Sequence, residues 1–578
     1  MSATDKETPG SDPGPAVTKR GHSHARSRSG GWREALAILG TWLLGSLVFF
    51  YDQWTSGFKR IMGNSGDTRL IVYLNEHWYL VLKAAQPWRS PPFFYPTKGV
   101  LGYTDTFFLW QLVYAPFRLL GADPFLAFQL SIVALSLLGF ASFVVLVRSI
   151  FGAPLAAGLV GALVFTFANN LSQHAGSPQM FGIYFAPAIV LVALWSWRRR
   201  VSRPLVSVIL ALCFGALCAL FLFSTYYAAW LTILSAGVVF VVAFLFGPRA
   251  MAVGCAAGLR SGWRTILGGL AGAAIGIIPF LMTYVPALDQ LGGRHYGRVL
   301  SSAPSVSYLW NLTPGNIFWR HLVGVHMAPP RPAAVGFSYA VTPVLLGTVV
   351  VGAVGLVWAV ARHRVRLDPM VRLTLALCCA SIVLAVLPIE TSAGSLWSIV
   401  WHLPGATAIR AIARVEVAND LVTALALVGL ITEAIRHWER LRGSTILRTL
   451  GVAVLCVIIV EQAHTSVSTD LNRGAQDAML ASVPTPPVGC TSFFVVDSVR
   501  NSMKYYEYQT GAMVIAQRIG VPTINGYSGD TPPGWKLLYP TSPNYTAAVR
   551  GWVDTHHLAG GICRLDLGTM TWERHPAW

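Results

Sequence analysis

Charged residues are scarce in this sequence. Asp, Glu, Lys and Arg together make up 12% of its 578 residues, whereas a soluble domain carries about 25%. Hydrophobic residues make up 54% of the chain, and the mean hydropathy is +0.54. This composition excludes an ordinary soluble protein and predicts a polytopic α-helical membrane protein.

Acidic residues are the scarcer of the two charge signs, which leaves a formal net charge of +18. A surplus of this size invites a nucleic-acid function, but no stretch interleaves aromatic and basic residues as a nucleic-acid module does. The basic residues instead form short clusters between apolar runs, for example from Arg198 to Arg203 and from Arg362 to Arg372. Cytoplasmic loops of membrane proteins show this distribution.

Cysteine is nearly absent from the polar parts of the chain. Only Cys490 and Cys563, of the eight cysteines, lie outside apolar runs. If the C-terminal part lies outside the cytoplasm, a disulfide between these two is the natural inference. The sequence also lacks CxxC and His/Cys spacings of the kind that bind metals, so no metal ligands are assigned.

The apolar runs predict about eleven transmembrane helices between residues 34 and 464. Residues 1–33 are rich in Gly, Pro, Ser, Lys and Arg, which predicts a disordered basic cytoplasmic tail rather than a signal peptide. An odd number of spans places the N-terminus in the cytoplasm and the C-terminus outside, and the basic clusters agree with this parity. We therefore expect a multi-pass protein of the inner (cytoplasmic) membrane.

The polar stretches between the spans define the remaining regions. We expect extracytoplasmic loops at residues 51–123, 285–336 and 388–414. From about residue 465 the sequence turns to loops and short β-like runs such as Ser492–Val496. This change predicts a small extracytoplasmic α+β domain over residues 465–578.

The first outer loop carries two acids, Asp67 and Asp105. Asp67 opens a stretch with apolar residues at helical spacing, which predicts a helix lying along the membrane interface. Asp67 has two interpretations, a chemical one as a general base and a structural one as the cap of this helix. An apolar segment over residues 106–120 follows Asp105; it is too short to span and is expected to be re-entrant or interfacial.

The other outer loops supply further polar candidates. Arg410 and Arg414 are four residues apart, so a helix would place them on one face. A carboxylate can deprotonate an acceptor hydroxyl, and arginines can hold the phosphate of a lipid-linked donor as it leaves. The additional candidates are Arg69 for the phosphate and His174, Tyr226, Tyr227 and Glu390 for substrate binding.

Each of these candidates also has a structural interpretation. A single histidine such as His174 can serve as a loop hydrogen-bonding residue. Arg410 and Arg414 can be anchors at the end of a span, and Tyr226 and Tyr227 can belong to an interfacial aromatic belt. These alternatives stay open from the sequence.

Several short motifs resemble the GT-C superfamily of integral membrane glycosyltransferases, in particular bacterial members that use polyprenyl-phosphate sugars. The matching segments are the GD pair at Gly66–Asp67, Trp78, FFYP at Phe93–Pro96, Asp105, HLPGATAIRAIAR at His402–Arg414 and NGYSGDTPPGW at Asn525–Trp535. The sequence departs from the family at Thr68 and Arg69, where a DxD or DE motif would carry a second acid. A divalent metal, Mg²⁺ or Mn²⁺, therefore stays an open alternative.

The resemblance implies a GT-C-like fold and an inverting transfer of a hexosyl or pentosyl group. The donor would be a polyprenyl-phosphate sugar, and the acceptor a glycan, lipid or protein at the extracytoplasmic face. Asp67 would be the base, Asp105 a second acid, and Arg410 or Arg414 the phosphate ligand. Two other classes compete with this hypothesis: a transporter or flippase for a lipid-linked or glycan substrate, and a non-catalytic envelope assembly protein.

Overall fold

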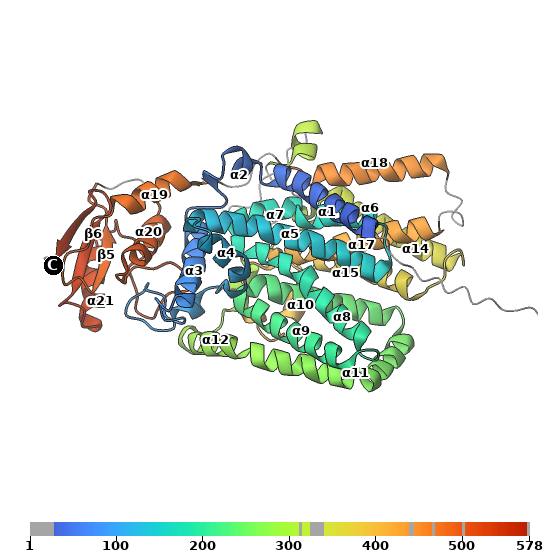
Figure 1. The fold of residues 1–578 in the computed structure, drawn as a ribbon, viewed down its shortest axis with the longest axis horizontal. Coiled ribbons are helices and arrows are strands. Elements are labelled where there is room, and N and C mark those ends of the chain that lie inside the picture. The colour runs from blue at the N-terminus through green and yellow to red at the C-terminus, as the bar shows by residue number, and fades with distance from the viewer. Residues whose placement is uncertain are drawn as a thin grey trace, which may run out of the picture.

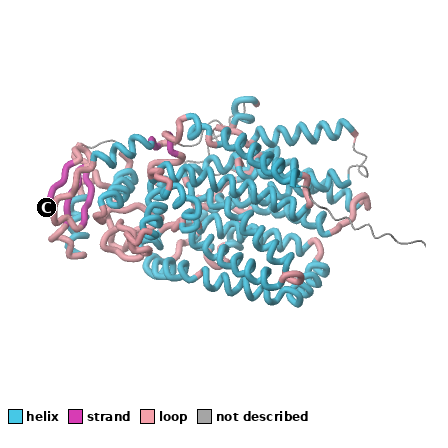
Figure 2. Tube along the Cα trace, viewed as in Figure 1, coloured by secondary structure: helices cyan, strands magenta, loops and turns pink. Residues whose placement is uncertain are grey.

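The structure, a computed structural model, describes residues 28–310, 315–323, 340–437, 444–464, 469–499 and 503–574. Most of the predicted N-terminal tail and part of the predicted 285–336 loop lie outside these residues. Figures 1 and 2 show a bundle of long helices with a smaller domain at one end, and the strands of that domain lie at the far left of the view.

Nine helices in the described part of the chain are long and apolar enough to cross a membrane, and a bent pair raises this number to ten. The pair, α11 (Pro248–Gly276) and α12 (Ile278–Leu291), bends by 48°. The nine spans contain α1 (Arg28–Phe49), α5 (Pro124–Phe151), α6 (Leu155–Thr166), α8 (Ala186–Arg199), α9 (Pro204–Ser224), α10 (Tyr226–Leu245), α14 (Pro343–Ala361), α15 (Pro369–Val386) and α17 (Val415–His437).

The count differs from the expected eleven at two places. Pro279 follows Gly276 at the start of α12, and a proline there cannot donate the helical hydrogen bond that would keep α11 and α12 straight. The run predicted over residues 450–460 forms α18 (Thr445–Glu461), which has 17 residues, whereas a span needs about 20. The polytopic helical architecture itself is confirmed.

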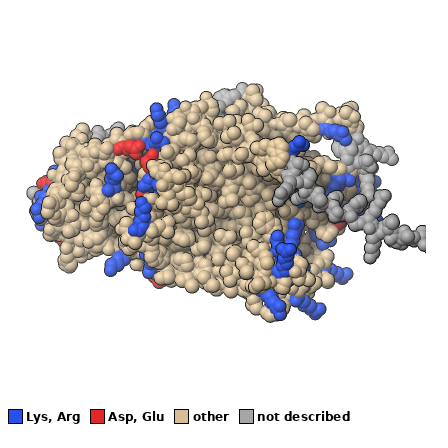
Figure 3. Space-filling view, viewed as in Figure 1, with Lys and Arg blue, Asp and Glu red and all other residues tan. Residues whose placement is uncertain are grey.

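Charged side chains follow the same layout. On the face drawn in Figure 3, Lys and Arg gather at the end of the bundle away from the C-terminal domain and again beside that domain. Uncharged side chains cover the helices between these two bands. A surface of this kind suits a protein whose middle section lies in hydrocarbon.

The helix after Asp67 is α3 (Asp67–Leu82), and it is not a surface helix with one exposed face. Eleven of its residues are buried because α4 (Gln111–Leu119) and α20 (Tyr505–Ile519) pack against it. Glu76 on α3 accepts hydrogen bonds from Arg118 Nε at 2.7 Å and from Tyr114 at 2.8 Å, both on α4. α4 leaves Leu112 exposed on its other side, as an interfacial helix would.

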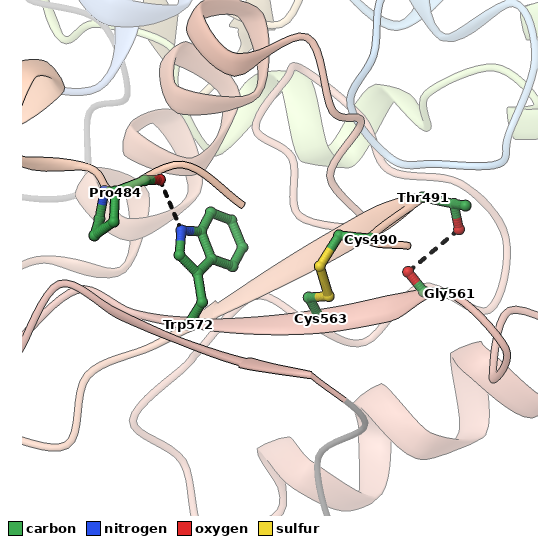
Figure 4. Close-up of a disulfide and its surroundings, with 6 residues drawn as sticks. All are labelled: Pro484, Cys490, Thr491, Gly561, Cys563 and Trp572. Carbon is green, nitrogen blue, oxygen red and sulfur yellow. Dashed lines mark hydrogen bonds between the residues drawn. A yellow bond between two sulfur atoms is a disulfide. The ribbon is translucent and has the colours of Figure 1, made fainter. Parts of the chain in front are cut away.

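The C-terminal domain has a three-stranded sheet in which β5 (Ser492–Val496) runs parallel to β6 (Ile562–Asp566), and β7 (Thr571–Arg574) runs antiparallel to β6. α19 (Arg473–Ser482), α20 and α21 (Tyr545–Thr555) surround the sheet (Figure 1). Cys490, two residues before β5, and Cys563 on β6, the pair expected from the sequence, are joined by a disulfide, as Figure 4 shows. The α+β domain expected at this end of the chain is therefore confirmed as a fold.

Segments between α1 and α4 hold this domain against the bundle. The strand β1 (Arg60–Ile61) pairs with β4 (Leu471–Asn472). The backbone of the FFYP segment pairs with the NGYSGDTPPGW segment, because Phe94 N–H donates to Asn525 O at 2.9 Å. The ring of Phe94 also packs on Trp535, with 4.9 Å between ring centroids. Two motifs more than 400 residues apart in sequence therefore form one interface.

Shorter elements complete the described chain. They are α2 (Tyr51–Thr55), η1 (Val100–Tyr103), η2 (Phe108–Trp110), α7 (Asn169–Gln173), η3 (His174–Gly176), η4 (Pro178–Phe185), α13 (Tyr296–Leu300), η5 (Val306–Trp310), η6 (Ile317–Leu322), β2 (Glu390–Thr391), β3 (Gly394–Ser395), α16 (Trp397–Val400), η7 (Ala406–Ala408) and η8 (Ile412–Arg414).

Candidate functional site

The carboxylate of Asp67 lies where the helical bundle meets the C-terminal domain. Its Oδ1 atom accepts a hydrogen bond of 3.1 Å from the hydroxyl of Tyr527, which belongs to the NGYSGDTPPGW segment. On the bundle side, Ser177, Arg414 and Arg410 each lie close enough to lower the pKa of Asp67. Asp67 is therefore held from both parts of the molecule.

The first turn of α3 explains how Asp67 is free to point at these partners. Asn64 Oδ1 accepts the backbone N–H of Gly66 at 2.9 Å and that of Asp67 at 2.7 Å, so Asn64 supplies the capping oxygen. Gly66 allows a close approach of the C-terminal domain, because a Cβ at this position would lie 3.0 Å from the ring of Tyr506. The carboxylate of Asp67 is thus not used as the side-chain cap of its own helix.

Arg414 reaches the site from the segment before α17. Its guanidinium donates a 2.9 Å hydrogen bond to the hydroxyl of Ser177 and lies over the ring of Tyr227, 5.1 Å from its centroid. Ser177 thus hydrogen bonds Arg414 and lies close to Asp67. The Nε atom of Arg414 is buried without a hydrogen-bond partner. A guanidinium with an unused donor is suited to binding an anionic group.

The four-residue spacing predicted that Arg410 and Arg414 lie on one face of a helix. The structure does not place them on one helix. Residues 409–411 are not helical, and only the short η8 precedes α17. The hydroxyl of Tyr227 accepts the backbone N–H of Arg410 at 2.7 Å and fixes this segment beside α10. Both arginines still act on Asp67, because the extended backbone brings Arg410 to the same carboxylate.

Asp105 joins the same cluster through α10. Its Oδ1 atom accepts the backbone N–H of Tyr226, the first residue of α10, at 2.7 Å. The carboxylate thereby satisfies a free donor at the positive end of that helix. The Tyr226 hydroxyl donates to Gly405 O at 2.9 Å. The predicted second acid and the two predicted tyrosines therefore hold the arginine segment in place.

Burial and charge act in opposite directions on the two acids. Desolvation raises the pKa of Asp67, and Arg414, Tyr527, Arg410 and Ser177 each lower it by a smaller amount. Desolvation also raises the pKa of Asp105, to about 6, against the Tyr226 hydrogen bond and Arg414. Burial and the neighbouring Asp67 raise the pKa of Tyr527, so its hydroxyl stays protonated and donates.

The remaining predicted residues lie at different distances from this cluster. His174 is buried on η3, three residues before Ser177, and lies within electrostatic range of Arg414. Arg69 turns to the C-terminal domain, where its Nε donates to Gln476 at 2.8 Å. Glu390 is exposed on β2 and takes no part in the described contacts that join the cluster.

Tyr527 and Ser177 belong to the site, and no sequence pattern predicted a role for either residue. Tyr527 lies within NGYSGDTPPGW, a segment whose resemblance to GT-C members could have directed attention to it. Ser177 belongs to the loop that also supplies His174. A serine in a loop carries no pattern of its own, so only the fold reveals that it lies beside Arg414 and close to Asp67.

The cluster is a poor fit for a divalent metal. A cation would use Asp67 and Asp105, the acids of the site, yet Arg414 acts on both carboxylates. The positive charge of the guanidinium opposes a second cation at the same oxygens.

The comparisons with known proteins identify a fold. No protein-family profile and no curated protein sequence matches the chain. The chain is similar to the crystal structure of the Archaeoglobus fulgidus oligosaccharyltransferase tethered with an acceptor peptide containing the NVT sequon, with a TM-score of 0.50 and 11% identity over 92% of this chain and 68% of that one. It is also similar to ArnT from Cupriavidus metallidurans bound to undecaprenyl phosphate, with a TM-score of 0.35 and 13% identity over 86% of each chain.

The likeness to the oligosaccharyltransferase establishes architecture. It extends over 92% of this chain. The chain thus has the GT-C-like fold that the short motifs predicted, in a multi-pass membrane protein.

Proposed function

We propose that this chain is a membrane glycosyltransferase. It moves a hexosyl or pentosyl group from a polyprenyl-phosphate donor to an acceptor hydroxyl at the extracytoplasmic face, with inversion at the anomeric carbon. The observation that carries this proposal is the position of Asp67 between the arginines of the bundle and the C-terminal domain. A base and a phosphate-binding group are the two functions that this transfer requires of the protein.

The chemistry is a single displacement. The acceptor oxygen attacks the anomeric carbon while Asp67 takes the proton of the acceptor hydroxyl. The bond between the anomeric carbon and the phosphate oxygen breaks, and the phosphate leaves with its electron pair. Arg414, with Arg410 beside it, neutralises the charge that develops on this leaving group. Attack from the side opposite the phosphate gives the inverted product.

Asp105 acts in this scheme as a positioning residue. It caps α10 at Tyr226, and the next residue, Tyr227, holds the backbone of Arg410 and the guanidinium of Arg414. Asp105 therefore helps to fix the position of the arginine segment relative to Asp67. It touches neither reacting group in the displacement.

The orientation follows from the charge distribution. Two bands of Lys and Arg are seen in Figure 3. The clusters between α8 and α9 and between α14 and α15 belong to the band away from the C-terminal domain, and by the positive-inside rule we assign that end to the cytoplasm. The active site and the domain then face outward. Reporter fusions after Arg203, Arg366 and Arg442 should give cytoplasmic signals, and a fusion after Asp470 an external one. A cytoplasmic signal at Asp470 would reject both the orientation and the placement of the site.

One observation favours a transporter instead. Glu416 and Asp420 are buried on one face of α17, and Tyr308 and Asn170 hydrogen bond to them. Acidic groups inside membrane helices often mark transport pathways. For a transferase these two acids are structural, so Asp420→Asn should leave sugar transfer intact, whereas a transporter should lose substrate movement.

The direct test is chemical. Surface glycans and lipids from a deletion strain are compared with the parent strain by mass spectrometry, and the loss of one sugar type identifies donor and acceptor. Purified protein should then transfer that sugar from its polyprenyl phosphate to the underglycosylated acceptor. Unchanged glycans and lipids in the deletion strain, together with no transfer by the pure protein, would reject the function.

A further inference from the structure

Four tyrosines of the C-terminal domain form a continuous row that ends at Asp67. The ring centroids of Tyr539 and Tyr505 are 5.3 Å apart, those of Tyr505 and Tyr506 are 5.3 Å apart, and those of Tyr506 and Tyr527 are 6.2 Å apart. The hydroxyl of Tyr527 then donates to Asp67. We call this set the tyrosine row.

The exposed fraction of the tyrosine side chains increases along the row with distance from Asp67. Tyr527 and Tyr506 are half-buried, Tyr505 is 37% exposed and Tyr539 is 55% exposed. Large aromatic side chains are usually well buried, since their rings contribute much of the apolar area in a core. Two neighbouring exposed rings beside a buried carboxylate therefore call for an explanation other than packing.

The chemistry of these rings identifies a class of ligand. Tyrosine offers a flat apolar face and a hydroxyl at one edge. A pyranose or furanose ring has a matching shape, with a C–H face and a rim of hydroxyl groups. Lys504 lies over the ring of Tyr506, 5.7 Å from its centroid. The outer rings, Tyr505 and Tyr539, are therefore the ones offered to a ligand.

We propose that the tyrosine row is a binding subsite for a neutral carbohydrate acceptor. Sugar residues stack on Tyr539 and Tyr505, and the chain they belong to leads its acceptor hydroxyl to Asp67. The inference rests on the proposed function, because it assigns the acceptor of that transfer to one side of Asp67. It also gives the C-terminal domain a role in recognition.

The two sides of Asp67 differ in a way that separates donor from acceptor. Arg410 and Arg414 approach from the bundle, and cations suit the phosphate of a lipid-linked donor whose chain lies in the membrane. The tyrosine row approaches from the C-terminal domain, which lies at one end of the helical bundle (Figure 1). A phosphate gains little from a tyrosine face, whereas a sugar ring gains apolar contact there. An acceptor therefore enters from the row.

The experiment measures carbohydrate binding without a donor. Saturation-transfer NMR is recorded on the purified full-length protein in detergent with neutral linear hexasaccharides of glucose, mannose and arabinose as probes. At least one probe should bind the wild type. The double variant Tyr505→Ala/Tyr539→Ala should weaken binding at least ~10-fold, which is the size of an aromatic contact of about 1.4 kcal/mol. Tyr505→Phe/Tyr539→Phe keeps both faces and should stay close to the wild type.

Val488→Ala is the matched control, because Val488 is 90% exposed on the same domain and lies outside the row. Equal binding by Val488→Ala and the wild type shows that loss in the double alanine variant is local. Failure of all three hexasaccharides to bind, or full binding by the double alanine variant, would overturn the subsite. Binding of a neutral hexapeptide at the row in place of the sugars would overturn it as well.

The outcome is separable from that of the proposed function. A protein that binds a hexasaccharide through the row but transfers no sugar keeps the subsite and loses the transferase. A protein that transfers sugar equally well with and without Tyr505 and Tyr539 keeps the transferase and loses the subsite.

Discussion

The hydroxyl of Tyr527 donates a hydrogen bond of 3.1 Å to Asp67 Oδ1, and the two residues are 460 positions apart in the sequence. The bond joins the C-terminal domain to the start of α3 at the acid proposed to do the chemistry. A donor on a carboxylate stabilises its ionised form. Tyr527 therefore helps to keep Asp67 a base although burial favours its protonated form.

Tyr527→Phe should shift the acidic limb of the pH–rate profile to higher pH. Without the donor the pKa of Asp67 rises, so a larger share of Asp67 is protonated and inactive at any acidic pH. The rate should recover as the pH is raised above the new pKa. The measurement is kcat/KM for transfer across pH 4 to 9. Tyr506→Phe is the control, since its hydroxyl does not bond Asp67, and an identical shift in both variants would contradict this assignment.

Arg414→Gln should lower affinity for the donor. Hydrogen bonds to charged groups are worth about 1.5–3 kcal/mol, which corresponds to roughly 10- to 100-fold in the Kd for a polyprenyl phosphate. Binding can be followed by the displacement of a fluorescent lipid phosphate. Arg69→Gln is the comparison, because Arg69 contacts Gln476 and Glu507 in the C-terminal domain. The Arg69→Gln variant should keep the wild-type affinity for the donor and make the C-terminal domain more sensitive to protease. Loss of donor affinity in Arg69→Gln, with normal affinity in Arg414→Gln, would exchange the roles of the two arginines.

The behaviour of Arg69 shows one limit of reasoning from the sequence. Arg69 lies two positions after Asp67, and proximity in sequence favoured a shared site. Residues i and i+2 of a helix point to different sides, so α3 directs Arg69 to the C-terminal domain and leaves Asp67 beside the arginines of the bundle. Its assignment as a phosphate ligand stays a prediction, which the comparison above tests.

Features that depend on composition could be predicted from the sequence. Apolar length located the helices, and the cysteine pair stood out because it alone lies in polar sequence. The contacts of Asp67 could not be predicted from the sequence. They come from Ser177, Arg414 and Tyr527, three residues on separate segments, and no periodicity links segments that only tertiary packing brings together.

Asp105→Asn should change how stability depends on pH. The pKa of Asp105 in the folded protein is raised from 3.8 to about 6, so the fold favours the neutral acid. That contribution is fully present below pH 4 and is lost as the pH rises through 6. Asn stays neutral and can still accept the Tyr226 N–H. The variant should match the wild type at pH 4 and be more stable at pH 7, by an amount on the order of 3 kcal/mol. Thermal unfolding of the variant and the wild type at pH 4 and pH 7 measures this difference in stability. The same difference between the two proteins at both pH values would refute the prediction.

Cys490→Ser/Cys563→Ser should destabilise the C-terminal domain. The disulfide spans 73 residues of sequence, and a crosslink of this length is worth about 4 kcal/mol in the chain-entropy description. Urea-dependent proteolysis of residues 469–574 should begin at lower urea in the double variant. Cys456→Ser controls for loss of a thiol, because Cys456 is a free cysteine on α18. Equal protease resistance in both variants would show that the bridge does not support the domain.

Asp67→Asn separates the chemical role of this residue from its structural one. Asn keeps the size of the side chain and can accept the Tyr527 hydrogen bond, but it has no basicity. Because Asn64 supplies the capping oxygen of α3, the unfolding temperature should change little, whereas turnover should fall about 100-fold or more, as expected for a lost general base. The control is Asp123→Asn: Asp123 caps α5 through Phe125 N–H at 3.0 Å, and Asn caps a helix about as well. Both variants should fold and bind a polyprenyl phosphate, and only Asp67→Asn should lose transfer. Near-normal transfer by Asp67→Asn would leave Asp67 with a structural role alone and would require another base.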